Sequence, residues 1–135
     1  MGGLKGTHVA VEAVARAQLG PTQIAVLGPV IDRRVEVAIK RLAAAVNDLE
    51  LAVVGAFAPD ELSLLLSDVD VLIVPSQCPE TFSQAAREAW SRGVPVFASW
   101  LGALADAVHD GENGFTFRHD DPRALGALLL RRVIN

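Results

Sequence analysis

The sequence predicts a doubly wound, Rossmann-like α/β fold in which a parallel sheet carries helices on both faces. Short, unbroken apolar runs alternate with helical patterns from one end of the chain to the other. Strands that are buried on both faces of a parallel sheet have this continuous apolar character. Glycine or proline closes these runs, for example at Gly28-Pro29, Gly55 and Pro75, as is typical of loops between such elements. The 135 residues predict a single domain spanning 1–135.

The first helix is predicted from Gly6 to Gln18, and Gly20-Pro21 ends it. Its apolar residues recur at helical spacing and share one face. These residues are Ala10, Ala13, Val14 and Ala17. A short apolar run at Gln23–Leu27 then predicts a buried strand, which Gly28-Pro29 closes.

Asp32 is predicted to cap the second helix, because its carboxylate can accept a hydrogen bond from a first-turn amide. The apolar stripe of that helix consists of Val35, Ile39, Leu42 and Val46. The next strand is expected at Leu49–Val54, ended by Gly55. A helix is then predicted from Pro59 to Ser67. Proline fits the first turn of a helix, where its nitrogen needs no hydrogen-bond partner, and the two acidic residues after it interact favourably with the positive end of the helix dipole.

The second half of the chain repeats this alternation. The predicted strands are Val69–Val74, Pro95–Ser99 and an edge strand at Phe115–Phe117. The predicted helices are Phe82–Arg92, stopped by Gly93, then Leu101–His109, and one opened by Asp121-Pro122. In the last helix Leu125, Leu128 and Leu129 are expected to face inward. A turn cluster at Asp110–Gly114 precedes the edge strand.

Composition excludes several classes of function. A net charge of −4 counts against a nucleic-acid partner, and the single Cys78 excludes a disulfide framework. No apolar run is long enough to span a bilayer, and Met1–Lys5 is too short to be a secretory signal. The three histidines have no metal-ligand spacing. Trp90 and Trp100 are expected to pack in the core or at its rim. We therefore expect a cytoplasmic domain.

Ligands of doubly wound sheets bind beyond the carboxyl ends of the strands, and the loop from Pro75 to Gln84 offers the most chemistry there. Thr81 and Gln84 fit a capping box at the start of the next helix. The same free amides could instead bind a phosphate, so the two interpretations compete. The other loops at this edge are Gly28–Ile31, Gly55–Pro59 and Ser99–Gly102.

Two glutamates flank the start of that helix, Glu80 before it and Glu88 about two turns later. A carboxylate beside a strand end can accept hydrogen bonds from the two hydroxyls of a sugar or ribose diol. Glu80 could instead only complement the helix dipole. Glu88 could instead pair with Arg92 at i+4 on the surface.

The order of several short motifs resembles the donor-binding domain of retaining GT-B glycosyltransferases of the family 4 type. The motifs are Lys5-Gly6, Val69–Ser76, Glu80-Thr81-Phe82 with Glu88, Gly93–Ser99 and Asp110–Phe115. They occur in the order of the predicted elements and cover nearly the whole chain. The sequence departs from the family pattern at Ser83, where glycine is usual, and at Gly102–Asp106, where one glycine and a glutamate are replaced.

The resemblance implies a role for each matching position. Glu80, the implied catalytic residue, would hold hydroxyls of the transferred sugar, and Glu88 the ribose. Thr81 opens the helix whose amides at Phe82, Ser83 and Gln84 would face the diphosphate, and Lys5 would neutralise its charge. The backbone around Phe57 and the side chain of Leu62 would border the base. No metal or other cofactor is expected, because Lys5 and the helix end would supply the charge stabilisation.

The resemblance further implies a hexosyltransferase that uses a nucleoside-diphosphate sugar such as a UDP- or GDP-sugar and retains configuration. The acceptor-binding domain of such an enzyme would be a partner outside this chain. A peripheral attachment of the larger enzyme to a membrane stays open. Two other functions also stay open: a nucleotide-binding module of the same fold without catalysis, and a nucleotide-sugar epimerase.

Only four residues precede Lys5, so the central first strand of the family domain is expected to be missing. The strands at Gln23–Leu27 and Val69–Val74 would then each have an unpaired inner edge. Unpaired buried backbone groups are costly. We therefore expect that these strands pair directly, that a second copy or an upstream segment supplies a strand, or that the domain exists only within a larger polypeptide.

Overall fold

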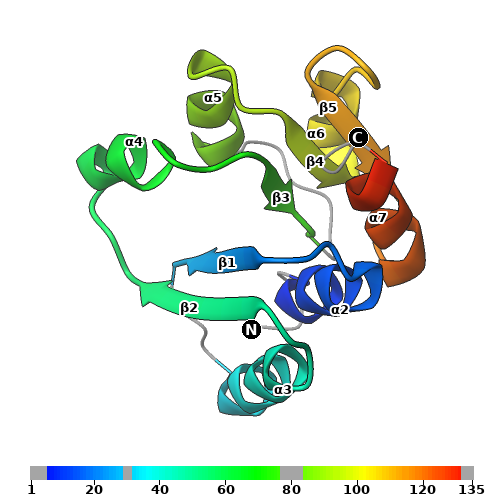
Figure 1. Ribbon diagram of the computed structural model, residues 1–135. Helices are drawn as coiled ribbons and strands as arrows, with labels where there is room; N and C mark the ends of the chain where they lie inside the picture. Colours follow the sequence, from blue (N-terminus) through cyan, green and yellow to red (C-terminus); the bar gives the residue numbers. More distant parts are fainter. Residues whose placement is uncertain (1–5, 29–31, 77–83, 132–135) are drawn as a thin grey trace.

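The structure is a computed structural model that describes residues 6–28, 32–76 and 84–131. Helices and strands alternate along the chain (Figure 1). The helices are α2 (Thr7–Ala17), α3 (Arg33–Ala44), η1 (Pro59–Glu61, a 3₁₀ turn), α4 (Leu62–Leu65), α5 (Gln84–Ser91), α6 (Gly102–Ala107) and α7 (Pro122–Leu129). The strands are β1 (Thr22–Leu27), β2 (Leu49–Gly55), β3 (Leu72–Val74), β4 (Val96–Ser99) and β5 (Gly114–Phe117). The element order therefore agrees with the prediction.

The strands of the described part form two parallel sheets, one of order β1-β2 and one of order β3-β4-β5. In the first sheet Thr22 pairs with Leu49, and the register continues to a bulge after Val26. In the second sheet Val96 of β4 pairs with Leu72 on one side and with Gly114 on the other. The parallel pairing of strands separated by helices confirms the predicted α/β class.

Strands β1 and β3 belong to different sheets, and no ladder joins them within the described residues. Of the three alternatives given above, direct pairing of these two strands is therefore wrong. In the described part each of these strands forms ladder hydrogen bonds along one edge, β1 with β2 and β3 with β4. The alternative routes, in which a further strand or a larger polypeptide completes the sheet, stay predictions.

Within the described residues the core consists of two apolar clusters, one on each face of the second sheet. One cluster joins α4, α5 and α6 to strand residues that include Val96 and Ala98. The other joins α2 and α7 to Phe97 and Phe117. Because side chains alternate across a strand, β4 sends neighbouring residues into opposite clusters, and all four of its residues are buried. Strand β4 is therefore covered by helices on both faces.

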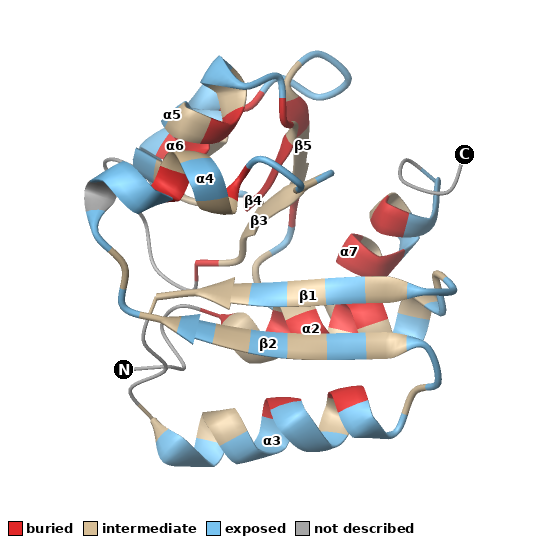
Figure 2. Cartoon of the chain, turned by 60° about the vertical axis from the view of Figure 1, so that its left-hand side comes forward, coloured by how far each residue is buried: buried red, intermediate tan, exposed pale blue. Residues whose placement is uncertain are grey.

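Strands β1 and β2 differ from this pattern because alternate residues are exposed (Figure 2). Ile24 and Leu49 pack against the cluster of α2 and α7. On the opposite face Gln23 and Glu50 are exposed, and the Gln23 Nε2 atom donates to Glu50 Oε2 at 3.0 Å. The expectation of a fully buried strand at Gln23–Leu27 is therefore wrong for alternate residues, since the described helices cover only one face.

Two predicted helix caps are confirmed. The Asp32 carboxylate accepts from the Arg34 amide at 2.9 Å at the start of α3. The Asp121 carboxylate accepts from the Ala124 amide at 3.0 Å, with proline at the start of α7. Leu125 and Leu129 of α7 are buried as expected. The Asp121 cap therefore fixes the start of a helix that completes one of the two clusters.

Replacing Asp121 by alanine is expected to destabilise the chain by about 1 kcal/mol, because one first-turn amide loses its acceptor. Urea unfolding of the two proteins measures this difference as a shift of midpoint at constant slope. Asp120→Ala is the matched control, since among the described residues Asp120 pairs with the exposed Arg118, a contact worth about 0.5 kcal/mol. Equal losses in the two variants would contradict the capping role.

The turn cluster before β5 is held by side chains on several sides. Asn113 Oδ1 accepts from the His109 amide at 2.8 Å, and Asp110 Oδ1 accepts from the Thr116 amide at 3.0 Å. The indole nitrogen of Trp90, on α5, donates to the Asn113 carbonyl at 2.9 Å. Trp90 also packs against the cluster of α4, α5 and α6, as expected for a packing tryptophan. The turn is therefore tied to α5.

Candidate functional site

The carboxyl ends of β3, β4 and β5 lie side by side, because the three strands are parallel and paired. In a parallel α/β unit, the helix after each strand begins at this same edge. Helix α5 therefore begins beyond β3, and α6 beyond β4. This edge is where the sequence predicts the ligand site.

Five of the predicted site residues lie outside the described residues. They are Lys5, Glu80, Thr81, Phe82 and Ser83. Gln84 is the first residue of α5 and is exposed. Phe57, Leu62 and Glu88 are described: Phe57 lies in the loop after β2, Leu62 on α4 and Glu88 on α5.

Phe57 and Leu62 lie in the same apolar cluster as α5. Phe57 follows β2 and packs, partly buried, against a cluster that contains Leu62, Ala86 and Ala89. Leu62 is only 4% exposed, so it mainly stabilises the α4–α5 contact and offers little surface to a ligand. The structure thus brings the predicted base-contacting segment next to the helix that carries Glu88.

Glu88 lies on α5 beside α4, where Arg92 links the two helices. The Arg92 Nε atom is 3.6 Å from Glu88 Oε1, and both side chains are about one-third exposed. The Arg92 guanidinium also donates to the Ser63 hydroxyl on α4. An exposed ion pair at i,i+4 is worth about 0.3–0.5 kcal/mol. The carboxylate can therefore be turned toward a diol at small cost.

Sequence reasoning missed the contact between Ser63 and Arg92. These residues are 29 positions apart, and nothing in the sequence signals that α4 and α5 adjoin there. Sequence reasoning also missed the exposure of Trp100, which was expected to pack in the core or at its rim and is 72% exposed. Its place directly after an apolar strand, in one of the loops expected at the carboxyl edge, is the signal that could have indicated this exposure.

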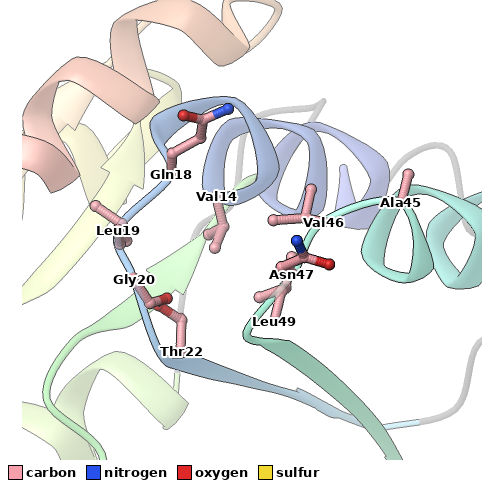
Figure 3. Close-up of a pocket in the computed structure, with 9 residues that line it drawn as sticks. All are labelled: Val14, Gln18, Leu19, Gly20, Thr22, Ala45, Val46, Asn47 and Leu49. Carbon is pink, nitrogen blue, oxygen red and sulfur yellow. The ribbon is translucent and has the colours of Figure 1, made fainter.

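A hollow of about 380 Å³ lies elsewhere, at the ends of α2 and α3 and the starts of β1 and β2 (Figure 3). Val14, Leu19, Val46 and Leu49 supply apolar surface, whereas Gln18 and Asn47 supply polar groups. This is the amino edge of the strands, opposite the edge at which ligands of this fold class bind. A second hollow, of about 430 Å³, lies against exposed residues of α3 and is lined by Arg33, Arg34, Val37, Ala38 and Arg41. Neither hollow contains a predicted site residue.

The described segments hold no group of three or more His, Cys, Asp or Glu side chains placed to bind a metal ion. None of the helices in the described part combines the length and the hydropathy needed to cross a bilayer.

Comparison with known sequences gives a family and several relatives. The profile of the family described as "Glycosyl transferases group 1" matches residues 1–134. The chain is 36% identical over 137 aligned residues to a D-inositol 3-phosphate glycosyltransferase of Acidothermus cellulolyticus. The alignment covers 93% of this chain and 30% of that protein. A lipopolysaccharide 1,2-N-acetylglucosaminetransferase of Salmonella typhimurium is 38% identical over 61 residues, covering 45% of this chain and 16% of the relative.

Solved structures show the same fold. The Anabaena protein HepE in complex with UDP matches 97% of this chain and 36% of its own with a TM-score of 0.80, at 23% identity. HepE in complex with UDP-glucose matches 98% of this chain and 36% of its own, again at 0.80, with 21% identity. Sucrose-phosphate synthase from Thermosynechococcus elongatus matches 95% of this chain and 34% of its own at 0.73, with 25% identity. The chain thus spans about a third of the length of these proteins.

Proposed function

Because this chain belongs to the glycosyl transferases of group 1, we propose that it is the donor-binding domain of a hexosyltransferase. The reaction would move a sugar from a nucleoside diphosphate to an acceptor hydroxyl with retention of configuration. The observation that carries this proposal is the placement of Glu88 on α5, the helix that contacts α4 through Arg92 and Ser63 and that shares an apolar cluster with Phe57. That arrangement joins a surface for a base to a carboxylate for a ribose.

We propose the following contacts with the donor. Glu88 accepts the two ribose hydroxyls, and the backbone around Phe57 borders the base, with Leu62 supporting it from the core. The amides of Phe82, Ser83 and Gln84, at the helix start opened by Thr81, donate to the diphosphate, and Lys5 neutralises its charge. Glu80 binds hydroxyls of the transferred sugar. With these cationic and amide groups at the phosphates, the site needs no metal ion.

The fold relative HepE is described in complex with UDP and with UDP-glucose, so uridine nucleotides are the first donors to test. We further propose a cytoplasmic location, which the single cysteine of the chain supports.

We also propose that a further strand, from a segment outside the described residues, lies between β1 and β3. The unpaired inner edges of these strands support it. A strand placed there would form ladder hydrogen bonds with both sheets and join them into one. The acceptor site would lie on a second domain, consistent with relatives of which this chain covers about a third.

Calorimetric titration with UDP, GDP and ADP tests the proposal. Lys5→Ala and Glu88→Ala are each expected to weaken binding of the preferred nucleotide about tenfold to a hundredfold, since each removes a charge-assisted contact of about 1.5–3 kcal/mol. Glu12→Ala is the matched control. Glu12 forms the same type of i,i+4 pair, with Arg16 on α2, and its loss should leave nucleotide affinity unchanged.

Unchanged nucleotide affinity in both Lys5→Ala and Glu88→Ala would contradict the proposed site. The residues at the start of the helix, Thr81 and Gln84, would then serve only as its predicted capping box. Binding without sugar transfer, in an activity assay of the polypeptide that includes the acceptor domain, would favour the non-catalytic nucleotide-binding module.

A further inference from the structure

The outer side of α3 carries three arginines around a shallow hollow. The hollow has a volume of about 430 Å³ and is lined by Arg33, Arg34, Val37, Ala38 and Arg41, all of which are exposed. Because successive residues of a helix are rotated by about 100°, these five side chains fall within a sector of roughly 140° around the helix axis. We call this sector the arginine face. It belongs to α3 alone within the described residues, since that helix lies at the edge of the molecule (Figure 2).

The arginines of this face have no acidic partner among the described residues. The ion pair that α3 does contain joins Lys40 Nζ to Glu36 Oε1 at 3.0 Å, and helical spacing places both residues on the flank outside the arginine face. Asp32, before the helix, accepts from the Arg34 amide as the cap. The neighbouring segment 29–31 contains no charged residue. The face therefore keeps three guanidinium charges that no described carboxylate pairs with.

Helix stability does not explain the first two of these arginines. Arg33 and Arg34 are the first residues of α3, at the end of the helix where the dipole is positive. Acidic residues stabilise this end of a helix, and cations destabilise it. Residues that break such a local rule without an evident gain in stability are expected where a function requires them.

The positive charge of α3 also contrasts with the charge of the whole chain. The helix contains four basic residues and one acidic residue, whereas the chain has a net charge of −4. Salt screens charges that lie more than about 8 Å apart under physiological conditions. An anion that approaches the outer side of α3 therefore meets the local positive charge and not the net charge of the chain.

We propose that the arginine face is a binding site for phosphate groups, separate from the proposed donor site. Each guanidinium presents N–H donors in a planar fork that matches two phosphate oxygens. Arg33 and Arg41 are eight residues apart, about 12 Å along the helix axis, so the face fits several neighbouring phosphates better than one. Helix α3 contributes no residue to the apolar cluster that contains Leu62 and contacts Phe57. The phosphates come either from a soluble polyphosphate or from the headgroups of an anionic lipid surface.

The site variant for testing this proposal is the triple substitution Arg33→Gln, Arg34→Gln and Arg41→Gln. Calorimetry with inorganic tripolyphosphate measures binding of free phosphate groups. Cosedimentation with phosphatidylglycerol vesicles measures binding of lipid headgroups, and phosphatidylcholine vesicles, which have no net charge, should bind no protein. Each arginine is expected to contribute about fivefold to the affinity, so the site variant should bind roughly a hundredfold more weakly.

A charge-matched control variant separates the site from the general effect of net charge. It carries Arg16→Gln, Arg118→Gln and Arg123→Gln, three exposed positions outside α3, and it is expected to keep its affinity for both probes. Urea unfolding checks the fold of the site variant. Its midpoint should equal or exceed that of the unchanged chain, because two cations have left the positive end of a helix dipole. A lower midpoint would show that these arginines stabilise the helix and would overturn the argument for a ligand.

The two probes and the nucleotide distinguish the remaining outcomes. Loss of tripolyphosphate binding in the site variant alone identifies a soluble phosphate ligand, and loss of vesicle binding alone identifies a lipid surface. Equal losses in the site and control variants, or no binding of either probe by the unchanged chain, would overturn the proposal. UDP affinity should be the same in the site variant and the unchanged chain, whereas a matching loss of UDP affinity would assign the arginines to the donor site. If the unchanged chain binds phosphate probes but no nucleotide, the proposed function fails and the arginine face stands.

Discussion

Phe97→Ala is expected to destabilise the chain by about 3–5 kcal/mol, the usual cost of truncating a buried phenylalanine. Phe97 is 1% exposed and lies in the cluster of α2 and α7. Its ring meets that of Phe115 edge-on, with centroids 5.4 Å apart and planes at 82°, a geometry that adds stability to an aromatic pair. A loss of this size is a large share of the roughly 5–15 kcal/mol that stabilise an ordinary domain.

Urea unfolding, followed by far-UV circular dichroism, measures the loss from the midpoint. Leu64→Ala serves as the control, because Leu64 is 77% exposed and its truncation should cost at most about 0.5 kcal/mol. A loss below about 1 kcal/mol in Phe97→Ala, far under the usual cost of such a truncation, would show that the two faces of β4 are not packed as described.

Gly114→Ala is expected to separate the start of β5 from β4 and to cost more than about 3 kcal/mol, beyond the usual range for overpacking. Gly114 pairs with Val96 and has a φ of 155°. A Cβ atom there would overlap the backbone carbonyl of Val96. A backbone carbonyl inside a sheet cannot rotate away as a flexible side chain can, so the strand itself must move.

Gly111→Ala is the matched control in the same turn. Gly111 has a φ of +85°, but a Cβ added there would meet no heavy atom within 4 Å, so this change costs only the backbone strain of about 1–2 kcal/mol. Thermal or urea unfolding of both variants separates the overlap from the strain. Equal losses would contradict the close approach of Gly114 to Val96.

The order of the elements could be predicted because local signals define it. Asp32 and Asp121 cap their helices through residues two and three positions away, so the sequence alone contains both partners. The extent of β3 could not be predicted in the same way. The apolar run suggests Val69–Val74, but the strand covers Leu72–Val74. The Leu72 amide donates to the Pro95 carbonyl, and Pro95 has no N–H with which to continue the ladder toward Val69.

Burial in the first sheet could not be predicted from the apolar runs either. Ala25 and Val54 continue such runs, yet both are exposed because no described helix covers their face. Which elements adjoin is a long-range property. An apolar run predicts that a strand forms and leaves open whether one face or both are covered.

The candidate site shows the same division between local and long-range contacts. The pair of Glu88 with Arg92 follows from helical spacing, and the structure contains it. The further hydrogen bond from Arg92 to Ser63 depends on how α4 and α5 pack together. The exposure of Trp100 likewise depends on which elements cover the end of β4. Sequence reasoning therefore found the chemical groups but not their neighbours.

The open inner edge of β1 has a consequence for handling this polypeptide. Thr22–Leu27 has the sequence TQIAVL, with no charge and no proline, and within the described residues only β2 pairs with it. Natural sheets protect such edges with charges, proline or a covering segment, because an unprotected edge recruits strands from other molecules. Unless another strand occupies it, β1 is a template for intermolecular aggregation, and a lysine in place of the exposed Ala25 would act as a gatekeeper.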